Sequence, residues 1–231
     1  MRNKQKGFTL IEIAIVLVII GLLLGGVLKG QELITSARVR NLITQQDGIK
    51  AAYFGFLDRF RALPGDYDQA TVNIANVVAG ACTGNGNGNG RIELGGAGNE
   101  SILVWEHLSK AGFINGSFTC NPTESASTTP TNAFAVRMQV VWDNVFFDTA
   151  NARAATPRHN LKSGGQIPSD LLAEVDRKID DGSATGGTFR FSDYDGGAGA
   201  PTGPAQCYLA AAPNQWSSST SVANCGGATL F

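Results

Sequence analysis

The sequence lacks the residue patterns on which most enzymes depend. Its 231 residues include two histidines, His107 and His159, and neither has a Ser, Cys or carboxylate at a recognisable motif spacing. No Cys-x-x-Cys pair, phosphate-binding glycine loop, nucleophile elbow or zinc signature occurs. We therefore expect that the protein is not an enzyme and carries no resident cofactor.

A strong charge of one sign is also missing. The chain has 18 Lys and Arg residues against 19 Asp and Glu residues, a formal net charge of −1. No basic patch and no basic stripe interleaved with aromatics occurs after residue 62. Because nucleic-acid binding depends on neutralising phosphates with Lys and Arg, nucleic acid is disfavoured as a partner.

Proline is absent before Pro64, and a long apolar run fills part of that interval. The run extends from Phe8 to Leu28 and contains one charged residue, Glu12. About twenty helical residues, at 1.5 Å each, reach across the ~30 Å hydrocarbon core of a membrane. A charge at that depth costs free energy, so Glu12 is a functional candidate that needs a cation.

Two ordinary explanations fit this segment poorly. A secretory signal peptide has a shorter apolar core with a small-residue cleavage site behind it, and no Ala-x-Ala follows this run. An ordinary single-pass anchor has no use for Glu12. The basic residues before the span, Arg2, Lys4 and Lys6, favour a cytoplasmic leader and an exported globular domain.

The junction between the leader and the apolar run carries a specific resemblance. It reads Gly7-Phe8-Thr9-Leu10-Ile11-Glu12, with an unbroken apolar stretch behind it. This segment resembles the N-terminus of type IV pilins and of the related type II secretion pseudopilins. The resemblance implies that a membrane prepilin peptidase cuts after Gly7 and methylates the new N-terminal amine of Phe8. It also implies that Glu12 pairs with the N-terminal amine of a neighbouring subunit during assembly.

The apolar half departs from the family pattern in one respect. Many pilins carry a proline late in this half, where the helix can melt during assembly, and none occurs here. Gly21, Gly25 and Gly26 are its weakest points, each costing up to about 1 kcal/mol of helix propensity. They predict either local melting or close packing against neighbouring helices.

A helical pattern continues beyond the apolar run. One stripe recurs at alternating steps of four and three residues, namely Thr35, Val39, Leu42, Gln46, Ile49, Tyr53, Phe56 and Phe60. Leu63-Pro64-Gly65-Asp66 then ends the helix, which we expect to extend from Phe8 to Ala62. The chain therefore divides into a leader (1–7), a transmembrane or filament-core half-helix (8–28), the second half of that helix (29–63) and an exported globular domain (64–231).

The globular domain reads as α+β. Apolar spacing predicts helices over residues 100–111 and from Ser169 or Asp170 to Asp181. Alternation predicts a strand over residues 134–143, and shorter strands are expected over 188–192 and 206–209. The order of elements resembles the pilin fold, in which an antiparallel sheet lies on the second half of the long helix.

Four cysteines lie in the exported part, and three pairings are available to them. An even number outside the cytoplasm favours disulfides over free buried thiols or metal ligands. We favour Cys82–Cys120 and Cys207–Cys225, because each pair would enclose one loop rich in Gly, Ser, Asn and Thr that lacks apolar anchors. The second pair resembles the C-terminal disulfide-bounded loop of many type IVa pilins.

One loop echoes an EF-hand calcium site. Asn85, Asn87, Asn89 and Glu93 place oxygen donors at spacings similar to those of the calcium loop. The early ligands are all neutral, and Gly96 stands where the bidentate Glu belongs, so a flexible Gly/Asn turn is the competing explanation. Asp193 and Asp195 form a second, smaller acidic cluster, but two carboxylates are too few to define a site, and a turn after a strand is the favoured explanation.

Three functions remain open at the level of sequence. The first is a structural subunit of a type IV pilus-type filament, held in the inner membrane before assembly and in an extracellular or periplasmic filament afterwards. Its partners would be other copies or related pilins, prepilin peptidase and the inner-membrane assembly machinery. The second is a type II secretion pseudopilin, which usually lacks the Cys207–Cys225 loop. The third is a minor pilin or tip adhesin with a calcium-assisted binding domain.

Overall fold

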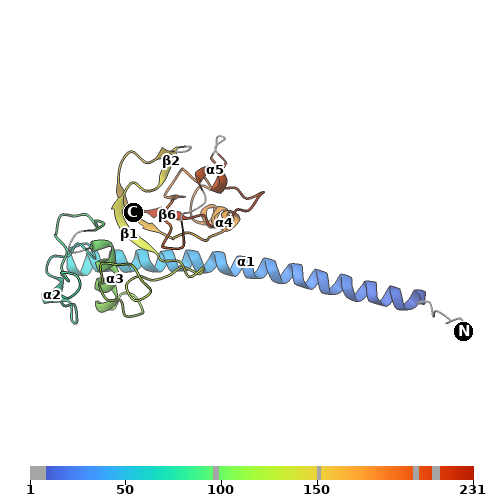
Figure 1. The fold of residues 1–231 in the computed structure, drawn as a ribbon, viewed down its shortest axis with the longest axis horizontal. Helices are drawn as coiled ribbons and strands as arrows, with labels where there is room; N and C mark the ends of the chain where they lie inside the picture. Colours follow the sequence, from blue (N-terminus) through green and yellow to red (C-terminus); the bar gives the residue numbers. More distant parts are fainter. Residues whose placement is uncertain (1–8, 96–98, 150–151, 200–202, 210–213) are drawn as a thin grey trace, which may run out of the picture. The chain divides into compact units, whose positions relative to one another are not determined.

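A computed structural model describes residues 9–95, 99–149, 152–199, 203–209 and 214–231. The predicted cleavage residues Gly7 and Phe8 lie outside the described residues. The chain divides into two compact units, Met1–Arg38 and Val39–Phe231. Helix α1, Leu10–Phe60, supplies residues to both of them (Figure 1).

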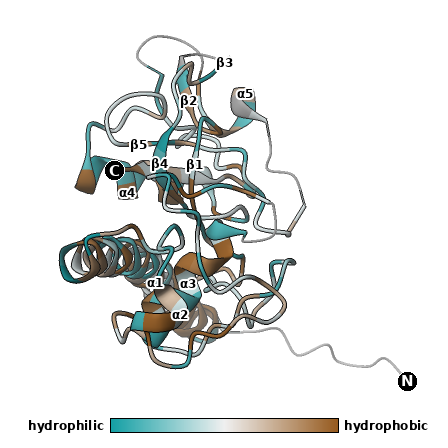
Figure 2. Ribbon diagram, turned by 90° about the vertical axis from the view of Figure 1, so that its left-hand side faces the viewer, coloured by the Kyte–Doolittle hydropathy of each residue, from teal (hydrophilic) through white to brown (hydrophobic). Residues whose placement is uncertain are grey.

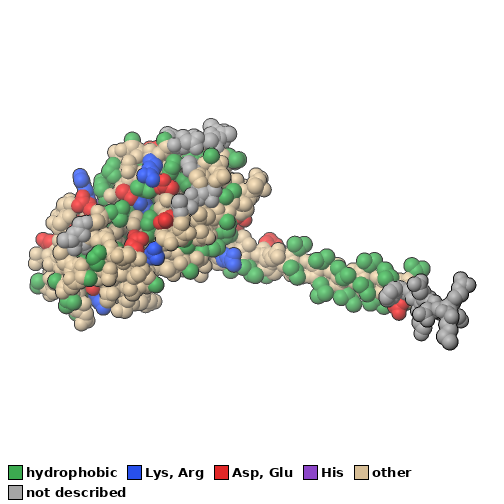
Figure 3. Space-filling model, in the orientation of Figure 1, with side chains coloured by type: hydrophobic (Ala, Val, Ile, Leu, Met, Phe, Trp, Pro, Cys, Tyr) green, Lys and Arg blue, Asp and Glu red, His purple; other side chains and the backbone are tan. Residues whose placement is uncertain are grey.

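In the first unit, α1 is apolar on all sides. Its large side chains from Leu10 to Leu28 are all exposed, and they cover the surface of this half-helix (Figure 3). Among the described residues, α1 is the one helix long and apolar enough to cross a membrane. The helix is unbroken through Gly21, Gly25 and Gly26, and a Cβ added at any of them would meet open space.

In the second unit, α1 buries one stripe of side chains. The fully buried positions are Val39, Leu42, Gln46, Ile49, Ala52, Tyr53 and Phe56, which confirms the stripe expected from the sequence over this part of the helix. The helix ends at Phe60, where Arg61 adopts a left-handed φ of 56°. The expected long helix is therefore confirmed for the described residues, with its end two residues early.

The second unit is built on a four-stranded antiparallel sheet in the order β1-β4-β6-β5. Its strands are β1 (Gln139–Asp143), β4 (Arg158–Lys162), β6 (Gly227–Leu230) and β5 (Phe189–Phe191). A small hairpin pairs β2 (Phe147–Thr149) with β3 (Ala152–Arg153). The remaining helices are α2 (Ala70–Asn73), α3 (Glu100–Lys110), α4 (Ser169–Ile179) and α5 (Pro204–Cys207).

Two hydrophobic clusters lie along the buried stripe of α1. One joins Ile49 to Phe56 of α1 with α3, β1 and β4, and the other joins Val39 and Leu42 with α4 and β5. Helices α2 and α3 lie together on one side of the second unit, and the sheet and α4 lie on the other (Figures 1 and 2). The structure is thus α+β, with the second half of α1 packed on an antiparallel sheet, as expected.

Three of the shorter elements also match their expected positions. Helices α3 and α4 form where apolar spacing predicted them, each ending one or two residues early. Strand β5 lies inside the predicted range 188–192. Gly182, the predicted stop of α4, has a φ of 76°, a conformation that glycine adopts readily.

The predicted strand over residues 134–143 is wrong in its first half, because β1 begins only at Gln139. Ala135 has a φ of 60°, which no strand residue adopts. The Asn132 side-chain oxygen accepts hydrogen bonds from the backbone N–H groups of Phe134 (2.8 Å) and Val136 (3.1 Å). This Asn-centred turn replaces the ladder, although the apolar alternation continues through it.

The predicted strand over residues 206–209 is also wrong. Pro204 to Cys207 forms the short helix α5, and Tyr208 makes only an isolated bridge to Trp216. Pro204 opens the helix at the position where a missing backbone N–H costs nothing.

His107 joins three segments in the core beside α1. Its Nδ1 accepts a hydrogen bond from the Gly65 backbone N–H at 3.0 Å, and its Nε2 lies 2.9 Å from the Gly84 carbonyl oxygen. The ring is fully buried, and burial lowers its pKa from 6.5 to about 4. Because Nδ1 must stay unprotonated to accept the Gly65 bond, the folded protein holds the neutral imidazole.

This geometry predicts an acid-sensitive component of stability. Between pH 6.5 and 4 the unfolded chain binds a proton at His107 that the folded chain does not, so stability falls as the pH falls through this range. The difference amounts to about 3 kcal/mol. In urea unfolding of the full chain in detergent, followed by tryptophan fluorescence, His107→Gln should lose less stability than wild type between pH 7 and 4.5.

His159→Gln is a parallel test rather than a control. Burial also lowers the pKa of His159 to about 4, so this variant should likewise reduce the loss of stability at low pH. Burial raises the pKa of Asp176 to about 6, so the contribution of this group to stability rises as the pH falls. That contribution is the same in wild type and variant, and it cancels when their losses of stability are compared. Identical losses in wild type and His107→Gln would contradict the assignment.

Candidate functional site

The first turn of α1 is closed by Thr9 and Glu12. The Glu12 Oε2 atom accepts hydrogen bonds from the Thr9 backbone N–H at 2.7 Å and from the Thr9 hydroxyl at 2.8 Å. The Glu12 backbone N–H in turn donates to the Thr9 Oγ1 at 3.4 Å. This reciprocal arrangement is a capping box, in which a Thr at the N-cap and a Glu three residues later satisfy each other.

Because of the capping box, the Glu12 carboxylate already has hydrogen-bond donors within its own helix. One carboxylate oxygen already has two donors from its own helix, so the charge is partly compensated before any partner arrives. No bond to Oε1 occurs within the described part of the chain. The sequence singled out Glu12 but missed Thr9; the Thr-x-x-Glu spacing at the start of a helical run was the available signal.

The surface beyond Glu12 is uniformly apolar. No other charged residue occurs between Thr9 and Leu28, and the first charges to follow are Lys29 and Glu32, which form an exposed ion pair at 2.6 Å. Glu12 is therefore the only fixed charge on a half-helix that otherwise suits lipid or other apolar helices.

The Asn/Gly loop is organised by carboxylates that the EF-hand reading did not include. Asp66 accepts hydrogen bonds from the backbone N–H groups of Asn89 (3.0 Å) and Gly90 (2.7 Å). Glu100 accepts them from the N–H groups of Asn87 (2.9 Å) and Glu93 (3.0 Å). The loop thus points its N–H donors inward at two protein anions.

The proposed calcium ligands are engaged elsewhere. The side-chain oxygens of Asn85, Asn87 and Asn89 each accept a backbone N–H bond, from Thr71, Asn89 and Arg91 respectively. The side-chain amides of Asn87 and Asn89 both donate to Glu93 Oε2, at 3.3 and 3.0 Å. The described hydrogen bonds are those of an Asn/Gly turn, the explanation that competes with the cation site.

The carboxylates of the second acidic cluster, Asp193 and Asp195, have partners within the described part of the protein. Asp193 pairs with the Arg153 guanidinium, and Asp195 Oδ1 accepts the Gly197 N–H at 2.9 Å. A tighter group of carboxylates, Asp176, Asp180 and Asp181, lies at the end of α4. Asp176 there accepts the Trp216 Nε1–H at 2.6 Å, and Asp180 accepts the Phe189 N–H at 2.8 Å.

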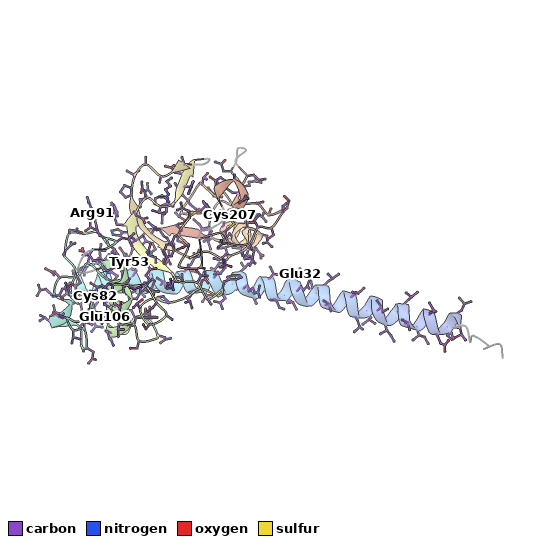
Figure 4. The ribbon with its side chains drawn as sticks, viewed as in Figure 1. Glu32, Tyr53, Cys82, Arg91, Glu106 and Cys207 are labelled. Carbon is purple, nitrogen blue, oxygen red and sulfur yellow. A yellow bond between two sulfur atoms is a disulfide. The ribbon has the colours of Figure 1, made fainter. Side chains whose placement is uncertain are left out.

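Both disulfides have the expected partners. The structure links Cys82 to Cys120 and Cys207 to Cys225 (Figure 4). The Cys207–Cys225 bond belongs to the cluster with α4 and β5, where it ties α5 to the segment before β6. The Cys82–Cys120 bond fixes two loops beside α3 and lines a cavity of about 160 Å³ together with the buried carboxylate of Glu106.

The comparison with known families agrees with the N-terminal geometry. Residues 2–28 match the prokaryotic N-terminal methylation motif, which is the type IV pilin-type leader signature. The motif marks the chain as a pilin-like or pseudopilin substrate of prepilin peptidase, and with the apolar helix it fits membrane anchoring of a pilin-type protein. No curated protein and no solved structure matches the chain.

The loop geometry yields a prediction about calcium and Asp66. Calcium should leave the melting temperature unchanged, because the candidate oxygens already accept hydrogen bonds. Asp66→Ala should destabilise the second unit by about 1–3 kcal/mol, since it removes the buried carboxylate that accepts the Asn89 and Gly90 N–H groups. Thermal unfolding of both proteins with calcium and with chelator measures both effects. Asp68→Ala, a change at a neighbouring exposed acid, is the control, and a calcium-dependent rise in wild type would restore the cation site.

Proposed function

We propose that this protein is a structural subunit of a type IV pilus-type filament. It is made as a membrane-anchored precursor, cut after Gly7, methylated on Phe8 and assembled through α1. The observation that carries the proposal is the methylation motif at residues 2–28, joined to a half-helix whose one charge is Glu12. We propose no enzymatic activity for it.

Assembly exchanges one apolar environment for another. In the membrane, lipid covers the exposed side chains of residues 10–28, and in a filament the same surface packs against helices of other subunits. Apolar packing alone does not fix the axial position of one smooth helix against another. Glu12 supplies that information, because its carboxylate stabilises the arrangement that brings a neighbouring N-terminal amine to it.

The capping box makes this exchange feasible. Thr9 satisfies Oε2 within the monomer, so the precursor does not carry a bare carboxylate in hydrocarbon. Cleavage after Gly7 then creates a new amine on Phe8, four residues before Glu12. The amine of one subunit becomes the cation for another only after processing, which makes assembly depend on the peptidase.

The second unit suits an exported position. Both disulfides lie within it, and disulfides persist outside the reducing cytoplasm. The Cys207–Cys225 loop favours a pilus subunit over the second candidate, a type II secretion pseudopilin, which usually lacks it. Both candidates share the N-terminal processing.

Processing provides the first functional prediction. Mass spectrometry of purified assemblies should find an N-terminus at Phe8 that is heavier than the unmodified chain by one methyl group. Gly7→Val should leave the precursor at full length, because the peptidase needs a small side chain beside the bond that it cuts. An N-terminus at any other residue would remove the pilin-type assignment.

The second functional prediction concerns the role of Glu12 in assembly. Glu12→Leu should be inserted and cleaved normally, since leucine suits the membrane, yet should form few or no filaments because the axial register is lost. Glu32→Leu is the matched control, an acid on the same helix whose partner Lys29 is exposed, and it should assemble. A cleavage blot and filament counts by electron microscopy separate the two steps. If Glu12→Leu forms as many filaments as wild type, the proposed role of Glu12 in assembly is wrong.

A further inference from the structure

A buried lysine and an aspartate meet between two neighbouring strands of the sheet. Lys162 is the last residue of β4 and Asp143 is the last residue of β1. In the antiparallel register Lys162 lies opposite Gln139 and Asp143 lies opposite Arg158, so the two side chains reach each other along one face of the ladder. The Lys162 Nζ atom contacts Asp143 Oδ2, and the two side chains are 2% and 14% exposed. A lysine is among the residues most rarely buried, so its position here calls for a reason beyond packing.

The Lys162 Nζ atom has both polar and aromatic neighbours. Nζ also donates to the Gln139 side-chain oxygen at 3.3 Å, and it lies 5.5 Å from the centre of the Tyr194 ring. Burial lowers the pKa of Lys162, against the opposing effect of Asp143. Burial therefore shifts this amine toward its neutral, nucleophilic form.

The Asp143 carboxyl group is held in a geometry that suits nucleophilic attack at its Cγ atom. Its second oxygen, Oδ1, accepts hydrogen bonds from the Val145 backbone N–H at 3.1 Å and from the Asn160 side-chain amide at 3.0 Å. Two fixed donors on one carboxyl oxygen, with an amine at the other, form the arrangement that stabilises the oxyanion of a tetrahedral intermediate.

A third carboxylate lies close by. Asp193 precedes Tyr194 in the chain, and its charge acts on Lys162. Its Oδ2 accepts from the Arg153 Nε–H at 3.1 Å, whereas its Oδ1 is buried and has no hydrogen-bond partner in the described part of the protein. Among the described residues, Asp193 thus offers an unpaired carboxylate oxygen near the lysine, and we assign it the proton transfer in the step below.

We propose that Lys162 and Asp143 condense to an amide bond between Nζ and Cγ. The reaction begins with a proton moving from the ammonium to Asp143 Oδ2, which leaves a neutral amine beside a neutral carboxyl group. The nitrogen attacks Cγ, and the charge that develops on Oδ1 is stabilised by Val145 and Asn160. Asp193 takes a second proton from the nitrogen and delivers it to Oδ2, which leaves as water.

Burial favours condensation over the ion pair. Two charges removed from water carry a desolvation cost that their attraction repays only in part, and the amide carries no charge. Because the buried contact holds the two reacting groups together, the reaction proceeds as an intramolecular step at high effective concentration. The product also releases a water molecule from a site that excludes solvent. No oxidant or cofactor is required.

The bond would join the edge strand of the sheet to its neighbour. Strand β1 has a partner on one side only, β4, within the order β1-β4-β6-β5. A covalent link at this place prevents β1 from peeling away under force or protease attack. This consequence holds whatever assembly the chain enters, so it stands independently of the proposed filament.

Intact mass and peptide mapping test the proposal on the full chain. After correction for processing and disulfides, wild type should lack the mass of one water molecule, and digestion should yield one branched peptide joining the Lys162 and Asp143 segments. Lys162→Met and Asp143→Ala should both regain the full sequence mass. Mapping is needed because succinimides at the Asn-Gly pairs also lower the mass.

The chain supplies an internal control. Lys178 and Glu174 form an ion pair at 2.8 Å on α4, but both side chains are about 40% exposed, and they should yield no branched peptide. Asp193→Asn should reduce the cross-linked fraction, and an unchanged fraction would overturn the proton-carrying role. If the wild-type chain has its full sequence mass, the proposed bond is wrong. This measurement does not depend on the folding of any variant.

Discussion

The buried stripe of α1 from Val39 to Phe56 is the contact on which the second unit depends. Both of its main hydrophobic clusters include residues of this stripe, so the sheet, α3 and α4 all share core contacts with one helix. Gln46 in the middle of the stripe accepts a hydrogen bond from the Thr229 hydroxyl of β6 at 2.8 Å, and both groups are buried. That one polar contact fixes how the helix lies on the sheet, because a shift along its axis would leave two buried groups unpaired.

Periodicity explains why much of this could be predicted from the sequence. The spacing of Val39, Leu42 and Ile49 reports which face of α1 is buried, and the amphipathic pattern of α4 does the same with Gly182 as its stop. Local chemistry sufficed for the N-terminal motif, since a peptidase reads residues that are adjacent in the chain. The cysteine pairing followed from loop composition, which is also a local property.

The rest depends on contacts between distant residues. The strand over residues 134–143 was misread because Ala135 adopts a left-handed turn that only the bonds from Asn132 stabilise. The contacts of the Asn/Gly loop could not be derived from the spacing of its oxygens, because its backbone N–H groups face Asp66 and Glu100. Asp66 precedes the loop by about twenty residues, and no spacing rule connects them. Lys162 and Asp143 were missed for the same reason.

Carboxylates recur as organisers of this chain, and the difference between them lies in what supplies their hydrogen bonds. Asp66 and Glu100 are satisfied permanently by backbone N–H groups of one loop, and they hold a fixed shape. Glu12 is satisfied on one oxygen by Thr9 and presents the other. A fully satisfied acid would gain nothing from a second subunit, and an unsatisfied one would be too costly to place in a membrane. In the assembly that we propose, half satisfaction is the condition under which the same carboxylate can stay in lipid and still favour a neighbour, and Thr9 would set the difference in free energy between the two states.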